Sequence, residues 1–177
     1  ACHCISNSVT RKIAALVLLL ASFTFVHAAG PQVLSFLSSI DDSDQPYALY
    51  SPPKLVPGKK YPLVVSLHGA WSNHRINLRR VFGQGNRAGE DDAAATLVFP
   101  PWKDVDFIVA SPYGRGTMTY QAMAETDVFD MLADVKRRFP IDEDRVYLTG
   151  LSMGGMGTLL LGLNHPDIWA AIAPVCP

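Results

Sequence analysis

The chain has 177 residues, a length typical of one domain and too short for two domains of ordinary size. Hydrophobic residues make up 49% of it, and 13 Gly and 13 Pro indicate a folded chain with frequent turns rather than disorder. Its 15 basic and 16 acidic residues nearly cancel. This balance excludes a strongly basic protein that binds nucleic acid or attaches to an acidic membrane through its charge.

Residues 1–28 have the pattern of a secretory signal peptide with a short upstream leader. Two basic residues precede an uncharged, apolar run at 13–26, and small residues follow that run. A membrane-spanning helix needs about 20 apolar residues, so the run is too short for a stable anchor. We expect cleavage after Ala28, with Ala29 as the alternative, and therefore a secreted or periplasmic protein.

The cysteines predict no metal site. Cys2, His3 and Cys4 lie ahead of the apolar run of the signal peptide, and two thiols with one imidazole are too few for a closed zinc site. Cys176 alone remains after cleavage. In an oxidising compartment it either pairs with a cysteine outside this chain or is a buried thiol. We expect neither a metal ion nor an organic cofactor.

After residue 30, apolar runs of strand length alternate with helical patterns, which is typical of βαβ units and a parallel sheet. The run at 61–67 is almost continuously apolar, as expected for a strand that is covered on both faces. The sequence predicts strands at 47–50, 61–67, 107–110, 146–149 and 170–175.

Residues 127–139 predict an amphipathic helix, because their apolar side chains recur at helical spacing on one face. Acidic residues fall in its first turn and basic residues in its last turn, which suits the helix dipole, and Pro140 ends it. Residues 73–82 favour a second helix, and residues 83–89 a loop.

Gly150-Leu151-Ser152-Met153-Gly154 matches the pattern G-x-S-x-G. It follows a predicted strand and leads into the apolar stretch 153–163, which favours a helix. In this context the pattern indicates a nucleophile elbow, with the hydroxyl of Ser152 exposed on a strained turn. Gly150 and Gly154 are required because a Cβ two residues before or after the serine would collide with neighbouring backbone. We therefore predict Ser152 as the nucleophile.

His68-Gly69-Ala70 closes the predicted strand at 61–67. At a nucleophile elbow, an early strand end supplies one oxyanion-hole amide and the residue after the nucleophile supplies the other. We assign these amides to Ala70 and Met153. His68 precedes the nucleophile at a strand end, which favours a structural role that orients the loop over the role of catalytic base.

Other polar and aromatic residues carry weaker signals. His165 follows the helical stretch directly and is interpreted as a helix-ending residue, and Glu125 and Asp127 as residues that cap or support the helix at 127–139. Arg115 either binds a substrate carboxylate or pairs with an acidic neighbour, and we favour the pair. The aromatic candidates for lining an acyl or alcohol pocket, with core packing as the alternative, are Trp71, Tyr113 and Tyr120.

Three segments together resemble secreted bacterial esterases of the α/β-hydrolase superfamily: 68–70, the turn at 111–116 and, above all, the block at 140–155, PIDEDRVYLTGLSMGG. The most similar groups are polyhydroxybutyrate depolymerase-like and feruloyl or acetylxylan esterase-like enzymes, which border on prolyl oligopeptidase-like hydrolases. The resemblance runs from Tyr47 to Cys176. It implies a three-layer sandwich with an eight-stranded, mostly parallel sheet and a catalytic triad in the order Ser, Asp or Glu, His.

The resemblance also implies that the acid and the base of the triad follow residue 177, since about six of the eight strands are present. We therefore expect residues 29–177 to be a partial α/β-hydrolase domain of a longer protein. Its expected activity is the cleavage of small-molecule or polymer-linked carboxylic esters through an acyl-enzyme. The alternatives are a serine peptidase of the prolyl oligopeptidase type and a binding module that has lost its triad.

Overall fold

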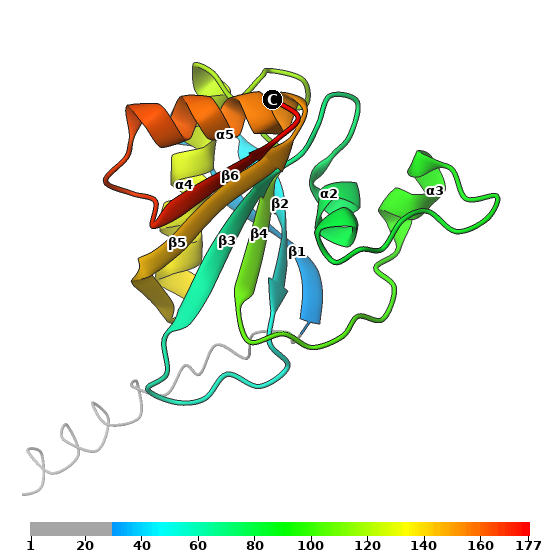
Figure 1. Ribbon diagram of the computed structural model, residues 1–177, viewed down its shortest axis with the longest axis horizontal. Helices are drawn as coiled ribbons and strands as arrows, with labels where there is room; N and C mark the ends of the chain where they lie inside the picture. The colour runs from blue at the N-terminus through cyan, green and yellow to red at the C-terminus, as the bar shows by residue number, and fades with distance from the viewer. Residues whose placement is uncertain (1–29) are drawn as a thin grey trace, which may run out of the picture.

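The computed structural model describes residues 30–177; the predicted signal peptide and its cleavage site therefore lie outside the described residues. One six-stranded sheet forms the centre of the molecule (Figure 1). Its strands are β1 (Gly30–Leu37), β2 (Asp44–Ser51), β3 (Tyr61–Leu67), β4 (Ile108–Pro112), β5 (Ile141–Leu151) and β6 (Ala171–Val175). The helices are α2 (His74–Val81), α3 (Asp92–Leu97), α4 (Met123–Arg138) and α5 (Met153–Asn164).

The sheet has the strand order β1-β2-β4-β3-β5-β6. The four strands β4, β3, β5 and β6 run parallel, while β2 is antiparallel to both β1 and β4. Parallel strands need a crossover connection: α2 and α3 lie in the one from β3 to β4, α4 in the one from β4 to β5, and α5 in the one from β5 to β6. The prediction of an α/β sandwich with a mostly parallel sheet is confirmed.

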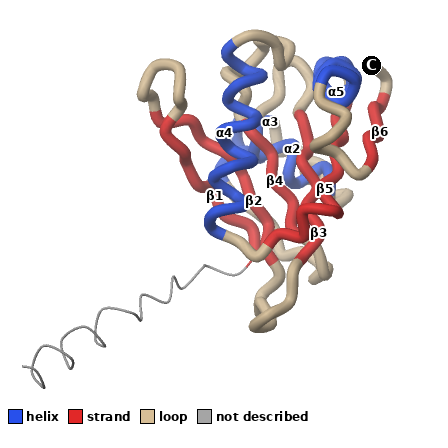
Figure 2. Tube along the Cα trace, turned by 90° about the vertical axis from the view of Figure 1, so that its left-hand side faces the viewer, coloured by secondary structure: helices blue, strands red, loops and turns tan. Residues whose placement is uncertain are grey.

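Helices cover both faces of the sheet, which makes the three layers (Figure 2). Successive side chains of β2 alternate between the cores on the two faces of the sheet. Tyr47 and Leu49 pack in the main core with α4 and α5, whereas Ala48 and Tyr50 pack on the other face with Leu78 of α2. Full burial of a side chain such as Leu49 contributes about 2 kcal/mol.

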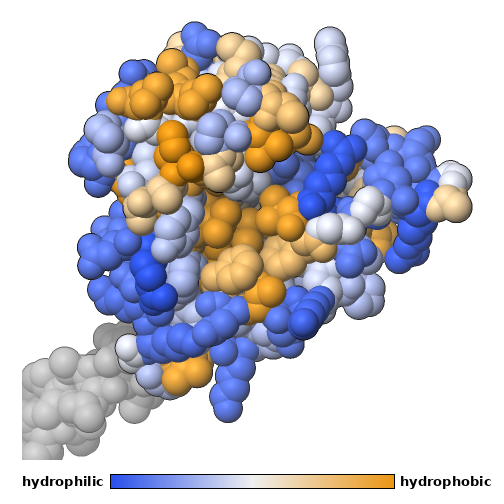
Figure 3. Space-filling view, in the orientation of Figure 1, coloured by the Kyte–Doolittle hydropathy of each residue, from blue (hydrophilic) through white to orange (hydrophobic). Residues whose placement is uncertain are grey.

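On the face covered by α2, the end of the sheet toward β6 stays open. Helix α2 packs against β2, β3 and β4, and apolar surface gathers over the centre of this face (Figure 3). Leu151 of β5 and Val175 of β6, which are paired, are both 45% exposed. Within residues 30–177, β6 pairs with β5 alone. The predicted strand at 170–175 is confirmed, and it begins at Ala171.

Two elements were not predicted, β1 and α3, and helix α4 begins earlier than expected. Strand β1 carries a weak apolar alternation and depends on its pairing with β2. Helix α4 begins at Met123, so Asp127 lies beyond the first turn and is buried; the prediction that Asp127 opens the helix is wrong. Among residues 30–177, no helix combines the length and the apolar character needed to cross a membrane.

Asp127 supports the fold through a buried ion pair instead. Its carboxylate accepts hydrogen bonds from Arg115 Nε at 2.5 Å and from Ser38 Oγ at 2.6 Å, and Arg115 also contacts Asp41 at 2.7 Å. The guanidinium of Arg115 therefore holds the pKa of the exposed Asp41 well below its usual range. This cluster joins the β1–β2 connection, the loop after β4 and helix α4, and confirms that Arg115 pairs with acidic neighbours.

Replacing Arg115 with Gln should lower the free energy of unfolding by about 3 kcal/mol, because Asp127 would remain buried without its cation. Urea-induced unfolding of the purified protein measures the loss. Arg145→Gln is the matched control, since its ion pair with Asp142 is more exposed and is worth less than about 1 kcal/mol. Equal losses in the two variants would contradict the structural role of Arg115.

Candidate active site at the strand–helix turn

Ser152 lies at the turn between β5 and α5. Its backbone has φ 56° and ψ −118°, a strained conformation for a residue with a side chain. Its amide donates to Val175 O at 2.9 Å, and its carbonyl accepts from Met156 N at 2.9 Å, so the strained turn is anchored at both ends. The residue is exposed. Strain held in place at an exposed serine is what a nucleophile elbow requires.

Two glycines permit this turn because backbone atoms occupy the space where side chains would lie. A Cβ on Gly150 would collide with the backbone of Gly154, and a Cβ on Gly154 would collide with the carbonyl of Leu67 in β3. Helix α5 therefore starts in direct contact with the ends of β3 and β5. The predicted need for glycine two residues before and after Ser152 agrees with these contacts.

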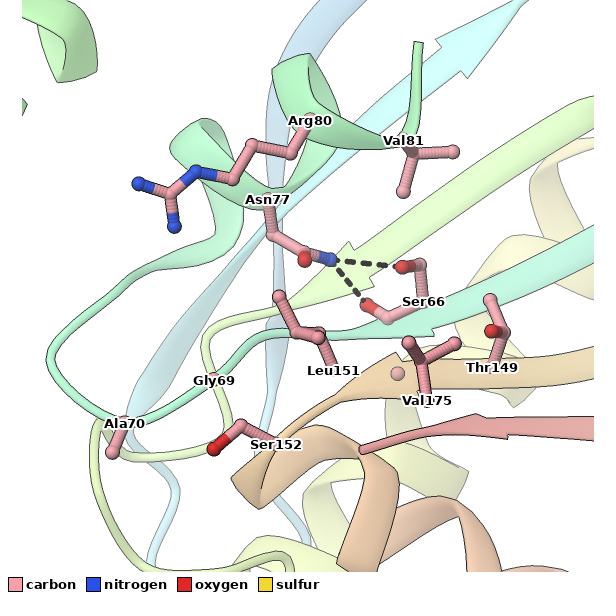
Figure 4. A pocket seen from close by; sticks show the side chains of 11 residues that line it. Ser66, Gly69, Ala70, Asn77, Arg80, Val81, Thr149, Leu151, Ser152 and Val175 are labelled. Atoms are coloured by element: carbon pink, nitrogen blue, oxygen red, sulfur yellow. Dashed lines mark hydrogen bonds between the residues drawn. The ribbon is translucent and has the colours of Figure 1, made fainter. Parts of the chain in front are cut away.

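Within the described chain, the hydroxyl of Ser152 is not engaged in a hydrogen bond that would hinder its reaction with a substrate. It does not cap α5, and it has no hydrogen-bond partner among residues 30–177. Figure 4 shows it directed toward the segment Gly69–Ala70. Gly69 lies against the elbow, because a Cβ on it would be 3.7 Å from the Cβ of Ser152. The structure thus brings the end of β3 next to the predicted nucleophile.

Of the two predicted oxyanion-hole residues, Ala70 lies near the hydroxyl of Ser152 (Figure 4) and Met153 directly follows Ser152 in the chain. Ala70 follows Gly69 in a turn closed by a hydrogen bond from Ser72 N to Gly69 O at 3.2 Å. Met153 is the first residue of α5, where an amide has no acceptor within the helix and points toward the N-terminal end. The arrangement fits two amide donors around a developing oxyanion.

His68 is fully buried beneath this turn. Its Nδ1 lies 2.8 Å from Gly69 O and its Nε2 lies 2.8 Å from Tyr113 O, so both ring nitrogens face carbonyl oxygens. Neither nitrogen is placed to take a proton from Ser152. The geometry supports the structural role inferred from the sequence.

The other predicted residues are dispersed. His165 follows the last residue of α5 and lies 2.8 Å from Glu125; the 12-residue helix separates it from Ser152 by about 18 Å, at 1.5 Å per residue. Tyr120 is fully buried, and its hydroxyl donates to His68 O at 3.2 Å. A pocket-lining role for Tyr120 does not fit this position, because the ring packs under Gly157.

Trp71 and Tyr113 remain candidates for contact with substrate. Trp71 directly follows Ala70, has φ 63° and is 89% exposed. Tyr113 is 36% exposed and packs its ring edge-on against His74 at 5.7 Å. Cys176 is exposed, so the reading of a buried thiol is wrong.

A cavity of about 460 Å³ opens beside Ser152. Its walls come from the ends of β3, β5 and β6, from the loop after β3 and from α2 (Figure 4). The lining residues are Ser66, Gly69, Ala70, Asn77, Arg80, Val81, Thr149, Gly150, Leu151, Ser152 and Val175. Within residues 30–177, no group of three or more His, Cys, Asp or Glu side chains is placed to hold a metal ion.

Sequence reasoning missed the contribution of α2 to this cavity. Asn77 is 7% exposed, and its amide nitrogen donates to Ser66 O, Ser66 Oγ and Ser111 Oγ at 2.9 to 3.0 Å. Arg80 extends along the outer wall. The one available signal was a polar Asn inside an otherwise amphipathic helical pattern, which indicates a buried hydrogen-bonding position.

Residues 38–177 match a family model described as "Putative esterase". The chain belongs to this esterase family. It is 30% identical over 130 residues to a bifunctional acetylxylan esterase/xylanase of Neocallimastix patriciarum. This match covers 71% of this chain and 17% of the relative. It is 40% identical over 45 residues to poly(3-hydroxyalkanoate) depolymerase C of Paucimonas lemoignei, covering 25% of this chain and 11% of the relative.

Among solved structures, a thermostable esterase matches with a TM-score of 0.61 and 27% identity, covering 83% of this chain and 41% of that one. The resemblance to α/β-hydrolase esterases is thus confirmed. The chain spans a small part of the curated relatives and less than half of this esterase.

His74, the first residue of α2, should make the stability of the protein depend on pH. Burial, with smaller contributions from Arg75 and His68, lowers the pKa of His74 to about 4, and its Nδ1 has no partner in the described chain. The unfolded chain binds the proton with a pKa of about 6.5. The contribution of His74 to stability is therefore complete above pH 6.5 and is lost as the pH falls toward 4.

We expect an NMR titration of the imidazole of His74 to have its midpoint near 4, well below the value of an exposed histidine. In His74→Gln, the fall in stability between pH 6.5 and 4 should be smaller than in the wild type. A midpoint near 6.5 would contradict the burial of this ring.

Proposed function

We propose that the complete protein is a serine hydrolase that cleaves carboxylic esters through an acyl-enzyme on Ser152. The observation that carries the proposal is the free, exposed hydroxyl of Ser152 on a strained turn, directed at Gly69–Ala70. In this mechanism the hydroxyl oxygen attacks the ester carbonyl, and the amides of Ala70 and Met153 stabilise the oxyanion. The alcohol then leaves and water releases the acid.

The proton from Ser152 requires a general base, and neither His68 nor His165 is placed to accept it. His68 is held by two carbonyl oxygens, and His165 lies at the far end of α5. We assign the base to a histidine, oriented by an Asp or Glu, in the sequence after residue 177. The substrate class proposed is a small-molecule or polymer-linked ester.

A fluorophosphonate probe should label the complete protein, and Ser152→Ala should abolish the labelling because the nucleophilic oxygen is removed. The complete protein should also hydrolyse p-nitrophenyl acetate and leave a proline-containing peptide intact, and Ser152→Ala should lower kcat for the ester by roughly 10⁴-fold or more.

Ser35→Ala is the matched control for both measurements. Ser35 is an exposed serine on β1, at the opposite edge of the sheet from the elbow, and its loss should change neither labelling nor kcat. Cleavage of the peptide alone would favour a peptidase of the prolyl oligopeptidase type. A protein that cleaves neither substrate and binds no probe would favour a binding module.

We also propose that the protein is exported, because the basic and apolar pattern of residues 1–28 has the form of a signal peptide. N-terminal sequencing of the mature protein from a host that secretes it should begin at Ala29. A mature protein that retains the apolar run at 13–26 would contradict export by cleavage.

A further inference from the structure

One charged side chain lines the cavity beside Ser152: that of Arg80. It lies on α2, which carries three arginines, Arg75, Arg79 and Arg80. The other ten lining residues are neutral. A single cation in a cavity next to a nucleophile can select a substrate by charge, provided that its hydrogen-bonding capacity is not already used within the protein.

The two other arginines have structural contacts. Arg79 is almost fully buried; it forms an ion pair with Glu90 at 2.9 Å and donates to the carbonyls of Ala95 at 2.6 Å and Gly85 at 3.1 Å. It thereby holds the segment between α2 and α3. Arg75 donates to the carbonyls of Thr96 and Leu97. Each of these two guanidinium groups therefore has fewer free N–H donors than that of Arg80.

Arg80 is different. Its side chain is 43% exposed, its nearest carboxylate oxygen is Asp92 Oδ1 at 3.6 Å, and its nearest other acceptor is Ser72 Oγ at 3.5 Å. Both contacts are long, and the side chain of Asp92 is 51% exposed, so the pair contributes little. A guanidinium has five N–H donors in a planar fork that matches a carboxylate. Most of those of Arg80 remain available.

The rest of the cavity wall favours an anion near Arg80. Val81, Leu151 and Val175 are apolar, and no acidic residue lines the cavity within the described chain. Asn77 directs its amide nitrogen away from the space, toward Ser66 (Figure 4). A negatively charged group that enters the cavity therefore meets one cation, and no fixed negative charge among the lining side chains.

We propose that Arg80 binds a carboxylate carried by the substrate, so that the preferred esters have a free acid group a few bonds from the scissile carbonyl. This inference rests on the proposed ester hydrolysis at Ser152. The carboxylate belongs either to the acyl part or to the alcohol part of the ester. Because Arg80 touches the distant group and not the reacting atoms, it lowers KM and leaves kcat nearly unchanged.

The test compares two pairs of esters in the complete protein. p-Nitrophenyl hemiglutarate carries a carboxylate where p-nitrophenyl valerate has a methyl group, and 3-carboxyphenyl acetate adds a carboxylate to the alcohol part of phenyl acetate. In one pair, the charged ester should have a KM about tenfold lower than its neutral partner. The pair that shows this preference identifies the part of the ester that Arg80 contacts.

Arg80→Gln should remove the preference, so that the charged and the neutral ester of that pair have the same KM. The preference in the wild type should fall as the salt concentration rises, because the pair is partly exposed. Arg87→Gln is the matched control, since it removes the same charge from an exposed residue outside the cavity. A wild type without preference, or a preference that survives in Arg80→Gln, overturns the inference.

Binding to Ser152→Ala, measured by calorimetry, separates this inference from the proposed function. Tighter binding of the charged ester that is lost in Ser152→Ala/Arg80→Gln supports the anion site even if the complete protein proves to have no esterase activity. Equal binding of charged and neutral esters by Ser152→Ala overturns the site even if Ser152 is the nucleophile.

Discussion

The close approach of three backbone segments at the elbow is the constraint on which the candidate site depends. Gly154 lies against the carbonyl of Leu67, and Gly150 lies against Gly154, with no room for a Cβ at either glycine. Because α5 begins in contact with β3 and β5, the turn at Ser152 is forced into its strained conformation. The same contact brings the loop after β3 within reach of the serine hydroxyl.

Buried polar groups then hold the loops around the elbow. His68 bridges two carbonyl oxygens, and burial raises the pKa of Tyr120, whose hydroxyl therefore stays protonated and donates to His68 O. A buried polar group without a partner is costly, so each of these contacts has few alternatives. The loop that carries Ala70 is thereby preorganised before any substrate arrives.

Sequence patterns predicted well the elements whose residues are mostly apolar and buried. Strand β3 agrees with its expected range of 61–67, and α5 begins at the expected residue, Met153. Strand β5 runs from Ile141 rather than 146, because Ile141 pairs with Tyr61 of β3 while the charged residues 142–145 that follow carry no apolar signal. Helix α3 is short, with one buried residue, Ala95, which leaves little periodicity to detect.

Helix α4 illustrates a different limit. Its apolar face was predicted from the helical spacing of the apolar residues in 127–139, and two of these, Val128 and Met131, are fully buried. Its beginning was not predicted, because Ala122 adopts a left-handed conformation with φ 51° before the helix. Nothing in the local sequence signals that conformation. The preceding loop carries Tyr120, which fills the space beneath α5.

The sequence by itself determined the sharp turn at Ser152, its two glycines and the parallel sheet, since these follow from short patterns whose geometry is local. Tertiary structure alone decided that Tyr120 is buried, that Asp127 pairs with Arg115 and that Arg80 faces the cavity of Ser152. Those outcomes depend on contacts between residues far apart in the chain, which exist only once the sheet has set the positions of its helices and loops.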